Sequence, residues 1–552
     1  MKDDVTPGAG GFDFEMWLEE LLGLNPWARG LTIDETNAEF IAARRKATLA
    51  RYAEGRAAWN AWAIAMLEQK KGLEAAGLFA HHETGDTWFG FARSEFSTKA
   101  APYRFEGHVS FDKFLFIGVT AFDNATFSGD ASFLGANFSA YASFQGATFA
   151  GLAYFRSVAI AGVNFGDATF FGIAAFDEAT FESAAAFDRA AFSTNAQFSD
   201  ATFAGAVQFG STTFAGPTWF TRATFTKAAW FGHAAFSGTT MFEGAKFKAD
   251  VRLPDVRFND AVDFARVRFE GLATFEGSHF RGGANFEWID STTAFSLAGA
   301  AFGQVPSFFG ATFKGVLRLD NVKTPRYGWL GYTPDRDARP RFRELRRRAV
   351  EAQDRGRELE FFAQEFRTGR FHSKHLPGWL PKVWNLGFWF GLAFEAFSNF
   401  GRSLWRPLFC WLALLLVFAI FYLGEHEDMR KQREALGPGG AWDTAITYFE
   451  TTRSALSDPP ACRAQGRGAF SATDAVTEAF NLSLATAMVF EGGRSNASRR
   501  TFGCLYGFET AGDQEYPIVS SRVSRASTLQ SLASAVLIFL FLLGVRNQLR
   551  LK

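Results

Sequence analysis

Large apolar residues recur through the middle of the chain at steps of five or six residues. In residues 201–220 (ATFAGAVQFGSTTFAGPTWF), phenylalanine stands at 203, 209, 214 and 220. A helix repeats every 3.6 residues and a strand every two, so neither alone places rings at these steps. A small or short residue stands two positions before each ring: Ala201, Val207, Thr212 and Thr218. The pattern predicts very short strands joined by turns, with both positions of each pair facing inward.

Four such steps add up to 22 residues, and the rings align in four columns at that spacing. One column runs from Phe122 to Leu319, and the register slips once, by one residue, between Ile160 and Phe165. We interpret four short sides as one coil of a solenoid, because a coil buries its rings only against neighbouring coils. About ten coils at ~4.8 Å predict a solid rod roughly 45–50 Å long. Its expected core includes Phe203, Phe209, Phe214, Phe220, Phe225 and Phe231.

Segments such as ATFAGAVQF and ATFSGDASFLGANFSAYASF resemble pentapeptide repeats. That resemblance implies a right-handed quadrilateral β-helix. The chain differs from strict pentapeptides by one added residue on alternate sides, ~22 rather than 20 per coil, so a rounder cross-section stays open. Members of the family that mimic DNA depend on strongly acidic surfaces. Here residues 131–150, 201–220 and 291–310 carry no charge, which argues against a mimic.

Helical patterns flank the repeat. Residues 34–78 are rich in Ala, Glu and Lys, and their apolar stripe around Trp59 and Trp62 is expected to cap the first coil. Residues 339–373 alternate Arg and Glu around Phe342, Leu345, Leu359, Phe362 and Phe366. Such charge runs are usually solvated helix faces, and contact with anionic lipid headgroups is the alternative.

Two long apolar runs follow. Residues 376–401 predict an interfacial helix, whereas about 404–423 and 528–545 are long enough to cross a bilayer. Basic residues precede the first of these two runs and follow the second: Lys382, Arg402 and Arg406 before it, and Arg546, Arg550 and Lys552 after it. The excess of positive charge predicts cytoplasmic N- and C-termini in a bacterial inner membrane, with residues 424–527 in the periplasm. The expected domains are a helical cap region (1–100), the β-helix (101–325), amphipathic and interfacial helices (326–400) and a transmembrane module (401–552).

Between the runs, residues 470–493 predict a half-helix of about 473–491 that re-enters the membrane, with Ser471 and Asp474 as a capping box. Cys462 and Cys504 lie in the same loop and are a plausible disulfide in an oxidising compartment, whereas Cys410 should be a buried thiol. FSNFGRSLWRPL, NLSLATA and GVRNQLRLK resemble bacterial membrane proteins that join pentapeptide repeats to a two-span, potassium-channel-pore-like module. Such pores carry a TVGYG-type run, but residues 489–499 read VFEGGRSNASR.

These features favour an oligomeric pore or ion-channel-like protein whose cytosolic β-helix gates or organises it. Ser483, Thr486 and Glu491 are candidate pore-lining residues, with ordinary helix-surface roles as the alternative. The second hypothesis is a membrane-anchored scaffold or sensor that binds a cytosolic protein partner through the rod without conduction. Membrane lipid and further copies of the chain are the other expected partners.

Other function classes find little support. Lys plus Arg equals Asp plus Glu at 57 each, so no global charge favours nucleic acid. No nucleotide-binding or catalytic motif indicates an enzyme or a cofactor. His372 and His375 have metal-like spacing without a further ligand nearby, so no metal site is expected.

Overall fold

The computed structural model divides into two compact units, Met1–Thr368 and Gly369–Lys552, which we describe separately. The residues that it describes are 14–32, 34, 37–79, 82–327, 335, 337–369, 386–436, 472–487, 505–506, 508–511, 514–517 and 521–549.

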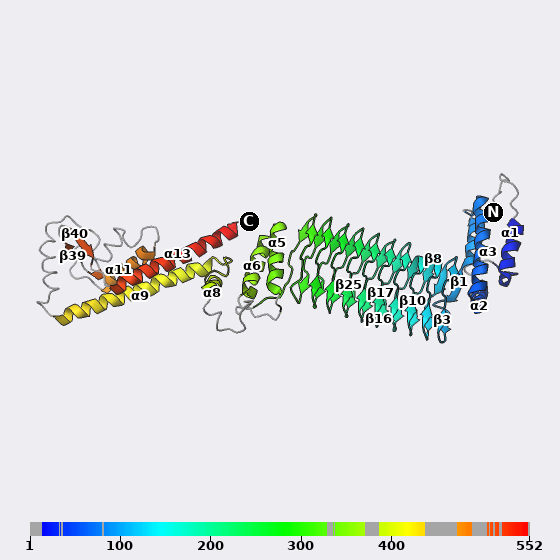
Figure 1. Ribbon diagram of the computed structural model, residues 1–552, viewed down its shortest axis with the longest axis horizontal. Helices are drawn as coiled ribbons and strands as arrows, with labels where there is room; N and C mark the ends of the chain where they lie inside the picture. Colours follow the sequence, from blue (N-terminus) through cyan, green and yellow to red (C-terminus); the bar gives the residue numbers. More distant parts are fainter. Residues whose placement is uncertain are drawn as a thin grey trace. The chain divides into compact units, whose positions relative to one another are not determined.

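A parallel β-solenoid forms the body of the first unit (Figure 1). Most of its strands are two residues long, and each pairs with the strand one coil later. Thr202 and Phe203, for example, pair with Thr224 and Phe225. The strands stand in four columns, so the coil has four sides and the 22-residue repeat is confirmed. Among the described residues the columns make up three sheets, named A, B and C below, of 19, 10 and 9 strands.

Sheets B and C each occupy one side of the rod. Sheet B contains β2 (Arg104–Phe105), β6 (Thr126–Phe127), β9 (Thr148–Phe149), β12 (Thr169–Phe170), β16 (Ala191–Phe192), β20 (Thr213–Phe214), β24 (Ala235–Phe236), β28 (Arg257–Phe258), β32 (His279–Phe280) and β36 (Ala301–Phe302). Sheet C contains β3 (Val109–Ser110), β7 (Ala131–Ser132), β10 (Ala153–Tyr154), β13 (Ala174–Ala175), β17 (Ala196–Gln197), β21 (Thr218–Trp219), β25 (Thr240–Met241), β29 (Val262–Asp263) and β33 (Ala284–Asn285).

Sheet A covers the other two sides. One side holds β4 (Leu115–Phe116), β14 (Thr180–Phe181), β18 (Thr202–Phe203), β22 (Thr224–Phe225), β26 (Lys246–Phe247), β30 (Arg268–Phe269), β34 (Asp290–Ser291) and β37 (Thr312–Phe313). The other holds β1 (Ser94–Ser97), β5 (Thr120–Phe122), β15 (Ala185–Ala186), β19 (Val207–Gln208), β23 (Ala229–Trp230), β27 (Val251–Arg252), β31 (Ala273–Thr274), β35 (Phe295–Ser296) and β38 (Leu317–Arg318).

Two longer strands, β8 (Asn137–Ser143) and β11 (Ala159–Asn164), run through the corner and join the two sides of sheet A. Phe138 pairs with Ile160, 22 residues later, whereas Tyr141 pairs with Gly162, 21 residues later. The one-residue slip in the sequence pattern is therefore absorbed as a bulge in a continuous strand, where no corner has to be closed.

The interior of the rod is packed with rings. Phe209 lies 4.8 Å from Phe187 and 5.0 Å from Phe231 between ring centroids, with the planes nearly parallel. The six predicted core phenylalanines are all fully buried. The short residues two positions before them are buried as well, including Thr212 and Thr218. Because burying one such ring stabilises by roughly 1.5–3 kcal/mol, the columns are the main source of cohesion between coils.

Many of the corners have a left-handed backbone without being glycine. Two corner columns have positive φ, and most of their members are not glycine. One column holds Lys113, Gly135, Ser157, Glu178, Asp200, Arg222, Gly244, Arg266, Trp288 and Gly310. The other holds Asn124, Gly146, Asp167, Arg189, Ser211, His233, Asp255, Gly277, Gly299 and Asn321. Because a left-handed conformation disfavours L side chains locally, packing of the columns has to impose it.

Helices cover both ends of the rod in the first unit (Figure 1). At the start lie α1 (Phe14–Leu24), the short helix η1 (Pro26–Ala28), α2 (Ala38–Ala53), α3 (Arg56–Ala75) and α4 (His82–Ala92). Trp59 is fully buried and donates its indole N–H to the carbonyl of Leu115 at 2.9 Å. The Asn60 amide donates to the carbonyl of Lys113 and accepts from the N–H of Leu115. The predicted stripe thus satisfies backbone groups that the first coil would otherwise expose.

At the other end lie α5 (Ala338–Glu351) and α6 (Arg355–Gly369). Phe342, Leu345 and Phe361 join the core of the rod. Phe366, which belongs to the apolar pattern seen in the sequence, is exposed, whereas Phe361, which does not, is buried. The charged residues are not all solvated either: Arg348 is buried and donates to the carbonyl of Ala311 at 2.6 Å.

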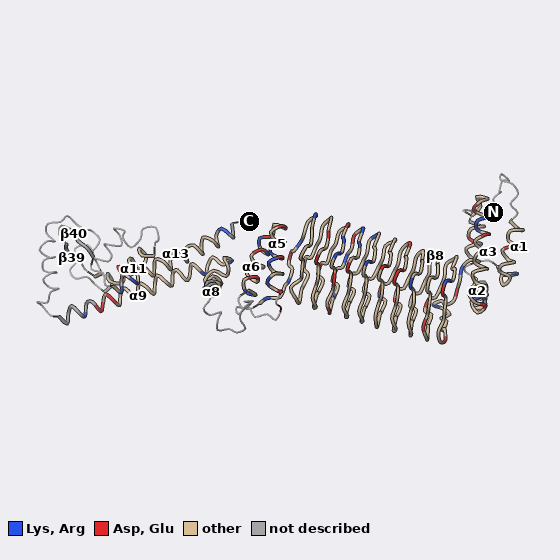
Figure 2. The backbone as a smooth tube through the Cα atoms, in the orientation of Figure 1, with Lys and Arg blue, Asp and Glu red and all other residues tan. Residues whose placement is uncertain are grey.

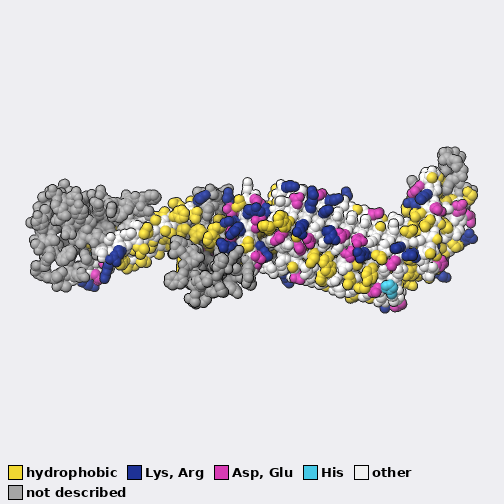
Figure 3. Space-filling model, viewed as in Figure 1, with side chains coloured by type: hydrophobic (Ala, Val, Ile, Leu, Met, Phe, Trp, Pro, Cys, Tyr) yellow, Lys and Arg dark blue, Asp and Glu magenta, His cyan; other side chains and the backbone are white. Residues whose placement is uncertain are grey.

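The second unit is helical. It contains α8 (Leu386–Ser398), α9 (Trp405–Leu436), α11 (Ala472–Ala487) and α13 (Ser521–Leu549), with a hairpin of β39 (Phe508–Ala511) and β40 (Gln514–Pro517). The segments Trp405–Asp428 and Ser521–Arg546 are long and apolar enough to cross a membrane. Only 22% and 28% of their most apolar windows are buried inside the structure, unlike the core helix of a soluble protein. Figure 3 shows hydrophobic side chains over this pair of helices.

Candidate functional site

The helix α11 packs against both apolar helices of the second unit. Its residues Ala479 and Leu482 form a small buried core with Tyr422 of α9 and Val523 of α13. Exposed apolar residues on the outer faces of the long helices include Leu416 and Ile420 on α9 and Val536 on α13. The three helices therefore bury a narrow interface and leave apolar surface on the outside.

A polar cluster centred on Gln530 lies inside this interface. The Gln530 amide N–H group donates to the carbonyl of Ser483 at 2.8 Å and to its hydroxyl at 2.7 Å. Its amide oxygen accepts from the Thr486 hydroxyl at 2.7 Å and the Tyr422 hydroxyl at 2.9 Å. All four side chains are at least 99% buried. We call these four residues the Gln530 cluster.

Two further bonds tie the cluster to the backbone of its neighbours. The Ser483 hydroxyl donates to the carbonyl of Leu415 in α9 at 2.8 Å. Ser531 of α13 donates to the carbonyl of Thr486 at 2.6 Å. Hydrogen bonds thus join α11 to both long helices, and the polar groups satisfy one another where water is excluded.

The predicted pore-lining residues have different positions. Ser483 and Thr486 are buried within one chain, and their hydroxyls make hydrogen bonds there. Glu491 lies outside the described residues, as do Ser471, Cys462, Cys504, His372 and His375. Cys410 is a free thiol, only partly buried on α9. In the part of the chain that the structure describes, no group of His, Cys, Asp or Glu could hold a metal ion.

Sequence reasoning missed Gln530 and Tyr422. A lone amide in an apolar run carries a signal, because a polar side chain within such a run usually faces protein rather than lipid. Its partners lie 44 to 108 residues away, so only the tertiary structure identifies them.

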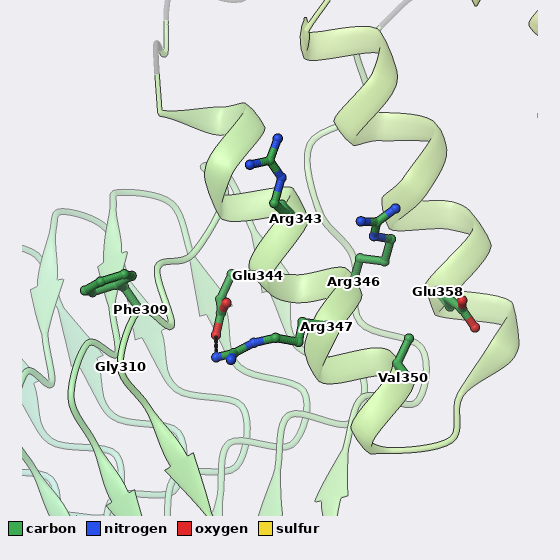
Figure 4. Close-up of a pocket in the computed structure, with 8 residues that line it drawn as sticks. All are labelled: Phe309, Gly310, Arg343, Glu344, Arg346, Arg347, Val350 and Glu358. Atoms are coloured by element: carbon green, nitrogen blue, oxygen red, sulfur yellow. Dashed lines mark hydrogen bonds and ion pairs between the residues drawn. The ribbon is translucent and has the colours of Figure 1, made fainter.

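A pocket of about 660 Å³ lies at the end of the first unit, between the last coils and α5 and α6 (Figure 4). Phe309 and Val350 provide apolar walls, and the other lining residues are Gly310, Arg343, Glu344, Arg346, Arg347 and Glu358. The guanidinium groups are already paired: Arg343 and Arg346 with Glu365, and Arg347 with Glu344 at 2.6 Å. The hydrogen bond to Glu344 raises the pKa of Arg347. A pocket whose charges cancel internally offers no strong recognition of a charged ligand.

Comparison with known proteins supports the repeat. Residues 209–257 and 242–287 match the family model for pentapeptide repeats (9 copies). No curated protein and no solved structure matches the chain.

Proposed function

We propose that this pentapeptide-repeat protein is an oligomeric membrane pore or ion-channel-like protein, with its β-solenoid as a gating or scaffolding domain. The observation that carries the proposal is the Gln530 cluster, because it anchors a half-helix between two helices suited to span a membrane. Non-helical or broken structure at membrane depth persists only where it packs on protein or lines a water-filled cavity.

The depth of the cluster supports this assignment. Leu415 lies ten residues after Trp405, which is about 15 Å along α9. The hydrocarbon core of a bilayer is about 30 Å thick. Because the Ser483 hydroxyl donates to the Leu415 carbonyl, the last turn of α11 would lie near the middle of the membrane.

One chain cannot enclose a pore with two spans and a half-helix, so several copies are required. Their contacts would cover part of the exposed apolar faces of α9 and α13, and lipid would cover the rest. Because the hydroxyls of Ser483 and Thr486 are used within the chain, the lining is expected from residues after Ala487, including Glu491.

The proposed location is a bacterial inner membrane, with both termini in the cytoplasm and residues 424–527 in the periplasm. The basic residues before the first span and after the second support this orientation, because positive charge beside a span favours the cytoplasmic side. The rod then lies in the cytoplasm.

Ion flux from liposomes tests the pore. The purified chain should have a detergent-corrected mass of several copies and should release trapped ions. Gln530→Leu should reduce flux because α11 loses its bonds to the Gln530 amide of α13, whereas Thr528→Val, on an exposed part of α13, should not. A monomeric mass, or no flux from an assembled wild-type complex, would rule out the pore.

The alternative is a membrane-anchored scaffold or sensor that does not conduct. The sequence at 489–499 favours it, because VFEGGRSNASR lacks a TVGYG-type run that replaces the hydration of potassium. In that case the helices tether the rod, and the wild-type complex stays silent in the flux assay while binding a cytosolic protein.

A further inference from the structure

Charge is confined to one half of the rod over five coils. In these coils the segments that form sheets B and C are 147–155, 168–176, 190–198, 212–220 and 234–242, and they contain no Asp, Glu, Lys or Arg. The charged residues from 147 to 242 all lie on sheet A or its corners: Arg156, Asp167, Asp177, Glu178, Glu182, Asp188, Arg189, Asp200, Arg222 and Lys227. Figure 2 shows the strands around β16 and β17 without charged residues. We call sheets B and C over these five coils the neutral faces.

The neutral faces also carry exposed apolar side chains. Phe171 is 54% exposed, and Tyr154 and Met241 are each 37% exposed. The neighbouring outward positions are small or uncharged, such as Thr213 and Gln197. Depletion of charge together with aromatic residues and methionine is the composition of a protein interface core.

The chemistry of these faces excludes several occupants. Without Lys or Arg they have no attraction for anionic lipid headgroups or for phosphate backbones. They contain no acidic cluster for a basic partner. The remaining candidate is an equally neutral protein surface, and another copy of the same chain provides one, because sheets B and C are both neutral.

Geometry then sets the arrangement. Sheets B and C are consecutive sides of a four-sided coil, so their outward directions differ by about 90°. If sheet B of one rod packs on sheet C of the next, each step rotates by that angle, and four steps close a ring. The corner between the two faces would point to the ring axis. The middle position of that corner is Gly151, Gly172, Thr194, Gly216 and Gly238 in the five coils, so a glycine stands there in all but one of them.

We propose that the rods of four copies pack side by side, each placing its neutral sheet B against the neutral sheet C of its neighbour. This deepens the proposed function, on whose assembly of several chains it rests. Five coils at ~4.8 Å and a side of about 15 Å give roughly 350 Å² per face and about 700 Å² per rod. A standard interface buries about 800 Å² per partner, more than twice the face that each rod buries against one neighbour, so the ring depends on the membrane helices to hold the copies together.

Cross-linking between chains tests the contact. Two full-length variants, Ala235→Cys on sheet B and Met241→Cys on sheet C, are co-expressed with Cys410, Cys462 and Cys504 replaced by alanine. These two positions lie in one coil, so a ring of parallel rods brings them together between neighbours. A short bis-maleimide should join Ala235→Cys to Met241→Cys chains. A chain carrying both should give products of up to four chains.

Gln208→Cys on the charged sheet A is the matched control and should not cross-link. Products that join Met241→Cys only to itself would overturn the ring in favour of a two-fold pair. No cross-link in a complex of several chains would overturn the proposal while leaving the pore standing. Cross-links without ion flux would support the ring and rule out the pore. If the alanine background is not assembled, the same pairs are placed in the wild-type chain, with its own products as baseline.

Discussion

Arg44 of α2 and Glu95 of β1 form an ion pair that is almost completely buried. Their side chains are 2% and 3% exposed, and the Nη2 to Oε2 distance is 2.7 Å. Arg44 also donates to the carbonyl of Gly90 at 3.2 Å. Removing one member of such a pair leaves the other charge buried without compensation. The pair thus fastens the N-terminal cap to the strand that begins the solenoid.

We expect Glu95→Gln to destabilise the cap by about 3 kcal/mol, because the guanidinium of Arg44 loses its opposite charge. Denaturant unfolding followed by tryptophan fluorescence measures this change, since Trp59 and Trp62 lie in the cap. Asp200→Asn is the control: it breaks an exposed pair with Arg222 and should lower the unfolding midpoint much less than Glu95→Gln does. Equal midpoints for wild type and Glu95→Gln would contradict the expectation.

Aspartates on the rod should respond to acid in opposite directions. Partial burial raises the pKa of Asp177, although the N–H of Ser199 one coil later donates to it. The hydrogen bond from Arg222 lowers the pKa of Asp200. A carboxyl whose pKa is raised in the folded state stabilises the fold fully at pH values below its ordinary pKa near 3.8. That stabilisation is lost as pH rises through the folded-state pKa. A lowered pKa adds stability above the ordinary value, which is lost as pH falls through the folded pKa.

Melting temperatures of wild type, Asp177→Asn and Asp200→Asn between pH 3 and 7 separate the two cases. As pH falls toward 4, the melting temperature of the wild type should rise relative to that of Asp177→Asn, because the native site favours the protonated carboxyl. Toward pH 3, the melting temperature of the wild type should fall toward that of Asp200→Asn, because protonation of Asp200 removes the pair with Arg222. Parallel curves for both variants would refute these assignments.

At the scale of elements, α11 depends on side chains from other helices. A helix of 16 residues is marginal in isolation, and the Gln530 cluster supplies bonds from α13 and α9 to its last turns. Buried interhelical hydrogen bonds in membranes contribute roughly 0.6–2 kcal/mol each. Gln530 makes several of them and is the hub.

Gln530→Leu should therefore loosen α11 without unfolding the long helices. We expect its amides around Ser483 to exchange hydrogen roughly tenfold faster, about 1.4 kcal/mol less protection, because those bonds are lost. Hydrogen exchange read by mass spectrometry on the chain in detergent measures this effect, with Thr528→Val as the control. Unchanged exchange in α11 would show that apolar packing alone holds it.

The elements differ in how far sequence predicts them. The strands of the rod follow from the five- and six-residue steps, because each ring needs a column and local turns set its direction. The long helices follow from apolar length. The buried face of α6 did not: Phe361, Phe362 and Phe366 are chemically alike, and only docking on the rod selects Phe361. Gln530 was missed for the same reason, since its partners come from distant segments.

For the whole molecule, the orientation across the membrane is the expectation most open to test. In a cysteine-free background, Gly439→Cys in the central loop should react with a membrane-impermeant maleimide added to cells whose outer membrane is permeable. Gln208→Cys on the rod should react only after the inner membrane is opened, because the rod is expected in the cytoplasm. Labelling with the opposite pattern would reverse the orientation.

The sequence by itself determined the solenoid, its 22-residue coil, its slip near residue 160 and two helices apolar enough for a membrane. Each is set by local spacing or length, so neighbouring residues suffice to specify it. Only the tertiary structure decided which corners take a left-handed backbone, how the end helices satisfy the terminal coils, and that Ser483 and Thr486 bind Gln530 inside one chain. Those outcomes depend on contacts between residues distant in sequence, where burial rather than local pattern sets the free energy.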